Sequence, residues 1–120
     1  MTKILLIEDI PDNAELVHKA LSQTGYDIAH AADAETGLAM ALAQCPDLIL
    51  LDLGLPDYGG QTLAGWLRGE SSLDGTPIVV LTAWPEEAAR QMVRSYRCNG
   101  FISKPIHHRT TRGYLQPNPR

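Results

Sequence analysis

The chain has 120 residues, 44% of them hydrophobic, and a formal net charge of −4 from 14 acidic and 10 basic side chains. This length fits one compact domain and excludes a multidomain architecture. The apolar content supplies a core without disulfide or metal support and argues against disorder. All 14 acidic side chains lie in residues 1–105, beside 7 basic ones. That balance argues against nucleic-acid binding, because phosphate contacts need a basic face.

The first half of the chain alternates strand and helix patterns. Residues 4–7 form a continuous apolar run, which is typical of a strand that is buried on both faces of a parallel sheet. A helix is predicted over residues 12–24, followed by a weaker strand over residues 26–31. Asp33 is expected to cap a second helix that ends before Pro46. The expected inward-facing side chains are Leu16, Val17, Ala20 and Leu21 of the first helix and Leu38, Ala41 and Leu42 of the second.

The second half repeats the alternation. Residues 48–51 and 78–81 are continuous apolar runs and predict two more buried strands. Between them, residues 60–68 predict a third helix. Pro85 opens a fourth helix at a favoured first-turn position, and residues 100–103 predict a short fifth strand. Five strands alternating with four helices predict an α/β fold with a doubly wound parallel sheet and right-handed crossovers.

Residues 106–120 differ from the rest in composition. They carry three arginines and no acidic residue, contain Gly113, Pro117 and Pro119, and lack an apolar repeat of 3.6 residues. We therefore expect a domain over residues 1–105 and an irregular tail over residues 106–120.

The cysteine spacing and the short apolar runs indicate a cellular compartment. Cys45 and Cys98 are far apart and have no metal-ligand spacing, which favours free, mostly buried thiols in a reducing environment over a disulfide. The first apolar run is too short for a signal peptide or a membrane span. We expect a cytoplasmic protein that does not associate with membranes.

Polar side chains follow four of the predicted strands. Glu8 and Asp9 follow the first, Asp52 ends the third, Thr82 ends the fourth and Lys104 follows the fifth. Because the carboxyl ends of parallel strands meet at the ligand-binding edge of such a sheet, these groups are expected to converge. Three neighbouring carboxylates repel one another unless a cation binds among them, and Mg²⁺ suits carboxylates and phosphoryl oxygens. One carboxylate could then attack a phosphoryl group, with lysine and hydroxyl assistance.

These residues and their order resemble the receiver domain of two-component response regulators, in a single-domain form similar to a chemotaxis regulator. The resemblance covers residues 1 to about 105. The matching segments are Ile7-Glu8-Asp9, the run from Asp52 to Gly60, Thr82-Ala83 and Lys104-Pro105. It implies the flavodoxin-like strand order 2-1-3-4-5. Receivers normally end in a fifth amphipathic helix, which the tail does not predict, so we expect that helix to be atypical or missing.

The resemblance also implies roles for the acidic residues. Asp52 corresponds to the phosphoacceptor. Glu8, Asp9 and Asp52, together with the backbone carbonyl of Gly54, correspond to the Mg²⁺ ligands.

The remaining site residues correspond to groups that contact the phosphoryl group or change conformation after phosphorylation. Thr82 and Lys104 resemble the hydroxyl and the cation of the phosphoryl site, and Thr82 and Phe101 resemble the pair that switches conformation. For Phe101 a simple core role is equally compatible with the sequence. Trp84 could shield the site from water or pack on the surface.

A receiver of this kind takes its phosphoryl group from a phosphohistidine of a sensor histidine kinase or phosphotransfer protein. Phosphorylation then shifts its binding to a downstream protein, so the protein is not expected to be an enzyme in the metabolic sense. Without a fifth helix, apolar surface beside the first helix would be exposed. We therefore expect self-association into a homodimer, through that face or through the fourth helix and fifth strand.

Three other functions fit the sequence less well. A phosphatase or phosphotransferase of the haloacid-dehalogenase type would need a second aspartate at position 54, which is glycine. A flavodoxin-like cofactor binder would need a phosphate-binding loop where Glu8 and Asp9 would repel phosphate. The main alternative is a receiver-like interaction module that is not phosphorylated.

Overall fold

Five parallel strands form one sheet in the computed structural model, which describes residues 2–21, 25–55 and 57–104. The strand order is β2-β1-β3-β4-β5. The strands are β1 (Lys3–Ile7), β2 (Asp27–Ala31), β3 (Leu48–Asp52), β4 (Ile78–Thr82) and β5 (Gly100–Ser103). The α/β fold and the strand order 2-1-3-4-5 are thus confirmed. The predictions for a fifth helix and for the tail concern residues 106–120, which lie outside the described residues.

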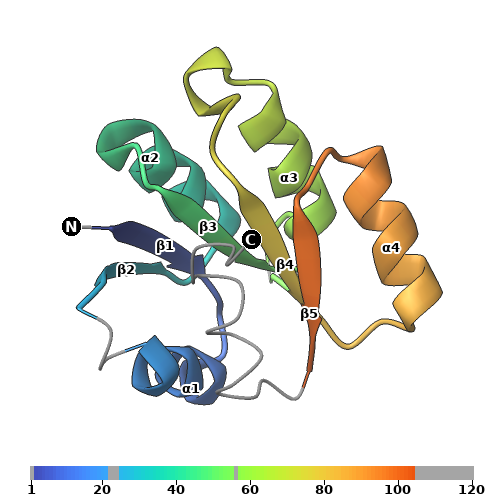
Figure 1. The fold of residues 1–120 in the computed structure, drawn as a ribbon, viewed down its shortest axis with the longest axis horizontal. Helices are drawn as coiled ribbons and strands as arrows, with labels where there is room; N and C mark the ends of the chain where they lie inside the picture. The colour runs from blue at the N-terminus through green and yellow to red at the C-terminus, as the bar shows by residue number, and fades with distance from the viewer. Residues whose placement is uncertain (1, 22–24, 56, 105–120) are drawn as a thin grey trace, which may run out of the picture.

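The helices of the described residues cover both faces of the sheet. They are α1 (Pro11–Leu21), α2 (Ala34–Gln44), α3 (Gly60–Arg68) and α4 (Glu86–Ser95), with a short 3₁₀ helix η2 (Ser71–Leu73). Helix α1 packs on one face, and α2, α3 and α4 pack on the other (Figure 1). The neighbouring interior strands β3 and β4 are buried along their whole length, which explains their continuous apolar sequences. These two strands carry Asp52 and Thr82 at their last positions.

Two helices differ from the prediction in the side chains that face the sheet. In α1 the buried set includes Ala14, whereas Leu16 is 46% exposed. In α2 Leu42 is exposed, and the buried side is formed by small residues such as Gly37. A Cβ atom on Gly37 would lie 2.7 Å from Cδ1 of Ile7. Helix α2 therefore lies so close to β1 that small residues, not leucines, fit between them.

Both cysteines are free thiols, but only one is partly buried. Cys98 is half-buried, and burial raises the pKa of its thiol. Cys45 is exposed at the C-cap of α2, with a left-handed φ of 47° and its N–H bonded to the carbonyl of Ala41. The prediction of mostly buried thiols is therefore wrong for Cys45.

The sheet face beside α1 is buried. Its side chains Val79, Leu81 and Ile102 are at most 3% exposed. On α1 itself, Leu16 is 46% exposed. Self-association through this face or through α4 and β5 stays a prediction. None of the helices in the described part of the chain has the length and apolar character that a membrane crossing requires.

Arg68 links three segments at the edge of the sheet opposite the polar residues. From the end of α3, its guanidinium donates hydrogen bonds to the carbonyls of Arg97 (2.8 Å) and Leu73 (3.0 Å) and to Oδ1 of Asn99 (3.0 Å). The same Asn99 oxygen accepts a bond from the backbone N–H of Ile78, the first residue of β4. The side chain thus fixes α3, η2 and the α4–β5 turn to one another.

Replacing Arg68 with alanine is expected to lower the free energy of unfolding by about 1–3 kcal/mol, because three hydrogen bonds from a charged donor are lost. Urea denaturation measures the change. Arg90→Ala is the matched control: Arg90 forms an exposed ion pair with Glu86 on α4, and its loss should change stability by less than about 0.5 kcal/mol. Equal effects of the two variants would contradict this account.

Candidate functional site

The strand register brings the predicted site residues to one edge of the sheet. Ile7 pairs with Leu51, so Glu8 and Asp52, which follow them, stand at the same level of neighbouring strands. Thr82 pairs with Ser103, which places Lys104 directly beyond it. The Lys104 N–H also donates to the Thr82 carbonyl at 2.8 Å.

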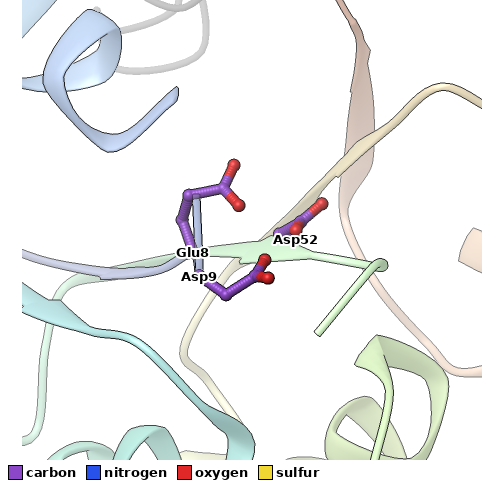
Figure 2. Close-up of side chains that lie close together, drawn as sticks. All are labelled: Glu8, Asp9 and Asp52. Carbon is purple, nitrogen blue, oxygen red and sulfur yellow. The ribbon is translucent and has the colours of Figure 1, made fainter. Parts of the chain in front are cut away.

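Three carboxylates meet in a small space at this edge. Glu8, Asp9 and Asp52 each offer an oxygen, and these atoms all lie within 4.8 Å of one another. Figure 2 shows the three side chains turning toward a common space, two from the end of β1 and one from β3. Glu8 and Asp52 are almost completely buried, at 0% and 1% exposure. Three buried oxygens have no hydrogen-bond partner: Glu8 Oε1, Asp9 Oδ1 and Asp52 Oδ2.

Lys104 supplies one positive charge to this cluster. Its Nζ lies 2.7 Å from Asp52 Oδ1 and 3.8 Å from Glu8 Oε1. One ammonium group cannot balance three carboxylates, and buried carboxylates without partners are costly. The arrangement therefore favours the binding of a further cation.

The electrostatic imbalance is visible in the pKa of Glu8, which is raised to about 7. Burial is the largest cause, and the neighbouring Asp52 carboxyl adds to it. The backbone N–H of Ile10, which donates to Glu8 Oε2 at 3.3 Å, and the charge of Lys104 act in the opposite direction without cancelling the shift. A cation among the carboxylates would favour the ionised form of Glu8.

The donor set fits Mg²⁺. Mg²⁺ prefers hard oxygen ligands and binds through a small number of carboxylates while keeping part of its water shell. The unpartnered oxygens of Glu8, Asp9 and Asp52 meet that requirement. Gly54 is exposed beside them, and a Cβ atom there would lie 3.6 Å from Asp52 Oδ2. The absence of a side chain at Gly54 thus leaves room next to the unpartnered oxygen of Asp52.

Thr82 is buried next to the cluster, and its hydroxyl oxygen accepts a hydrogen bond from the backbone N–H of Trp84 at 2.9 Å. Because this bond uses the oxygen as acceptor, the hydroxyl hydrogen remains available for donation. Trp84 itself is 36% exposed in the loop between β4 and α4.

Phe101 lies farther from the cluster than the other predicted residues. It pairs with Val80, the middle residue of β4. Its side chain is half-buried and packs against the core on the side of α2, α3 and α4. A surface groove of about 420 Å³ runs beside it, lined also by Val93, Arg90 and Arg94 of α4. The fold therefore brings six of the seven predicted residues to one site and places Phe101 on the α4 side of β5.

The sequence interpretation gave no role to Asp57, although this residue lies inside the matching segment after Asp52. Its carboxylate accepts hydrogen bonds from the backbone N–H groups of Ala34 and Glu35, at the start of α2. An aspartate directly after a proline in a loop was the available signal. The helix that it contacts lies more than 20 residues away in the sequence, so the pattern alone did not reveal the contact.

The sequence over residues 4–116 matches the family described as the response regulator receiver domain. The chain belongs to this family. The relatives of this receiver include the polar-differentiation response regulator DivK of Brucella ovis, which is 31% identical over 107 residues, or 88% of this chain and 87% of DivK.

Solved structures of receivers share the fold closely. The chemotaxis response regulator CheY4 of Vibrio cholerae superimposes with a TM-score of 0.89 at 28% identity, over 96% of both chains. A putative response regulator from Chloroflexus aurantiacus gives the same TM-score at 25% identity, over 95% of this chain and 93% of that one. The receiver fold and family predicted from the sequence are thus confirmed, and receivers are signalling modules of two-component systems.

Proposed function

We propose that this receiver accepts a phosphoryl group on Asp52 from a phosphohistidine of a sensor histidine kinase or phosphotransfer protein. The observation that carries the proposal is the buried cluster of Glu8, Asp9 and Asp52, whose oxygens lack partners while Lys104 contacts Asp52. In the transfer, the P–N bond of the phosphohistidine breaks and a P–O bond forms to an Asp52 carboxylate oxygen. The imidazole that leaves takes up a proton.

Each residue of the site has a role in this proposal. Glu8, Asp9, Asp52 and the Gly54 carbonyl would hold Mg²⁺, which supplies positive charge to the phosphoryl oxygens. Lys104, already 2.7 Å from Asp52, would stabilise the same oxygens. The hydroxyl of Thr82 would donate a hydrogen bond to them.

The output of the site is a change in protein binding. The Thr82 hydroxyl is held by the N–H of Trp84, so its movement toward a phosphoryl group would free the loop before α4. With Phe101 as the second switching residue, the change would reach the face of α4 and β5. We place the contact with the downstream protein, or with a second copy of this chain, on that face, and we place the protein in the cytoplasm.

The test is native mass spectrometry of the wild type and Asp52→Asn with Mg²⁺ and acetyl phosphate, an acyl phosphate donor. We expect the wild type to gain the mass of one phosphoryl group and Asp52→Asn to gain none. A change of oligomeric state on phosphorylation in the same spectra would identify self-association as the response to phosphorylation.

The rival function is a receiver-like interaction module that is not phosphorylated. It would be supported if a folded wild type that binds Mg²⁺ gained no phosphoryl group from acetyl phosphate or from any histidine kinase offered. The acidic cluster and Lys104 favour a receiver that is phosphorylated over this rival. Buried carboxylate oxygens without partners destabilise a fold, and an interaction module does not require them.

A further inference from the structure

The carboxylate of Asp57 joins two segments that are distant in sequence. Oδ1 lies 2.9 Å from the backbone nitrogen of Ala34, and Oδ2 lies 3.0 Å from the same nitrogen and 3.2 Å from that of Glu35. Burial opposes the ionisation of this carboxyl, but backbone N–H groups, those of Ala34 and Glu35 foremost, together lower its pKa below the usual range. The contact is therefore made by an ionised carboxylate that accepts charge-assisted hydrogen bonds from two backbone N–H groups.

Helix α2 receives a second cap from its own sequence. Asp33 is the N-cap residue, and its Oδ1 accepts the N–H of Thr36 at 2.8 Å. The N–H groups of Ala34 and Glu35 are among the first-turn donors that a helix cannot satisfy internally. Asp33 satisfies a local donor, whereas Asp57 reaches the first turn from another loop. Of these two caps, Asp57 is the one that connects α2 to the loop beside the phosphorylation site.

The loop that carries Asp57 is the one that borders Asp52. Gly54, the expected carbonyl ligand of Mg²⁺, lies two residues after Asp52, and Asp57 lies three residues after Gly54. At its far end the loop is held by Gly60, whose N–H donates to the Leu53 carbonyl at 3.2 Å. Between these points, the Asp57 carboxylate contacts the first turn of α2. The neighbouring Tyr58 ring packs against Trp66 of α3, with ring centroids 4.8 Å apart.

The other end of the contact lies close to Glu8. Helix α2 follows β2, and the last residue of β2, Ala31, accepts the N–H of Glu8 at 2.9 Å. His30 Nε2 also lies 2.7 Å from the Glu8 carbonyl oxygen, close enough for a hydrogen bond. Asp57 thus joins the loop after Asp52, on one side of the acidic cluster, to the connection between β2 and α2 beside Glu8, on the other side.

We propose that Asp57 is a positioning residue of the phosphorylation site, whose contact with the first turn of α2 holds the Gly54 loop in place beside Asp52. This inference rests on the proposed function, because it assigns the loop to Mg²⁺ binding. Groups that orient metal ligands without touching the metal commonly change metal affinity by tenfold or more.

The experiment compares Asp57→Ala with Asp33→Ala. Both variants remove one negative charge and one cap from the same end of α2, but only the first releases the loop. We expect an NMR titration with MgCl₂ to show an approximately tenfold higher Kd for Asp57→Ala and less than a twofold change for Asp33→Ala. Asp57→Asn, which keeps one acceptor oxygen, should lie between wild type and Asp57→Ala.

Two further readouts separate positioning from a general loss of stability. In phosphorylation by acetyl phosphate, Asp57→Ala should need about tenfold more Mg²⁺ for half-maximal rate, while the rate at saturating Mg²⁺ stays within about twofold of wild type. In EDTA, the Gly60 amide should exchange its hydrogen faster in Asp57→Ala than in Asp33→Ala, because the loop opens locally.

Equal Mg²⁺ affinities and equal Gly60 exchange in the two alanine variants would overturn the inference and leave Asp57 as an ordinary helix cap. If Asp57→Ala fails to fold, Asp57→Asn against Asp33→Asn gives the same comparison. A wild type that binds no Mg²⁺ would instead reject the proposed function. The exchange measurement in EDTA would still decide whether Asp57 holds the loop.

Discussion

In the absence of Mg²⁺, the free energy of unfolding of this receiver is expected to fall as pH rises from about 4.5 to about 7. The pKa of Glu8 is raised in the folded protein from 4.5 to about 7, so the folded state binds this proton more tightly than the unfolded state. Below pH 4.5 the carboxyl is protonated in both states and has no effect. Above pH 7 the folded state must hold a buried charge beside Asp52, with a loss of about 3 kcal/mol at most.

Urea denaturation in EDTA at pH 5 and pH 8 measures this loss. Glu8→Gln should be more stable than wild type at pH 8 and should lose most of the pH dependence. Glu15→Gln, which removes an exposed carboxyl on α1, should follow the wild type. Saturating Mg²⁺ should restore the stability of the wild type at pH 8, because the cation favours the ionised carboxylates. A wild-type stability in EDTA that does not change between pH 5 and pH 8 would refute the assignment.

Replacing Gly60 with alanine is expected to lower the free energy of unfolding by about 2–3 kcal/mol and to impair phosphorylation. A Cβ atom on Gly60 would lie 2.5 Å from the Cα of Leu53 and 2.6 Å from the carbonyl oxygen of Asp52. These are backbone atoms, so the start of α3 or the end of β3 must move to make room. A movement of the end of β3 would displace Asp52, the proposed phosphoacceptor.

Gly75→Ala is the control for this prediction. A Cβ atom on Gly75 would have no neighbour within 4 Å, and Gly75 is not among the glycines with a positive φ. Its replacement should change stability by less than about 0.5 kcal/mol and leave phosphorylation intact. Urea denaturation and the extent of labelling by acetyl phosphate give both quantities. If Gly60→Ala kept the stability and the labelling of the wild type, the backbone at Asp52 would tolerate displacement and the prediction would be wrong.

The sheet was predictable because its central strands are buried on both faces. The runs over residues 48–51 and 78–81 have no polar residue that could confuse a strand with an amphipathic helix. Helix faces were less predictable, as Leu16 and Leu42 show. A periodic pattern places a leucine near the inner face, but the distance between helix and sheet decides whether a leucine or an alanine fits there.

The acidic cluster was predictable because parallel strands carry their last residues to one edge. Glu8, Asp52 and Thr82 therefore meet in the fold as their positions in the sequence indicated. The contacts of Asp57 and Arg68 were not predictable, because each joins segments whose proximity depends on the packing of loops. The raised pKa of Glu8 could not be predicted from the sequence either, since its largest cause is the burial of the carboxyl in the folded protein.

The central claim is that Asp52 carries the phosphoryl group, and the most direct test locates that group chemically. The wild type is incubated with Mg²⁺ and acetyl phosphate, and the acyl phosphate is then reduced with borohydride, which converts a phosphorylated aspartate to homoserine. We predict that peptide mapping finds homoserine at position 52 and unchanged residues at Glu8 and Asp9. A folded protein that binds Mg²⁺ yet keeps an unmodified Asp52, or is modified at another carboxylate, would contradict the claim.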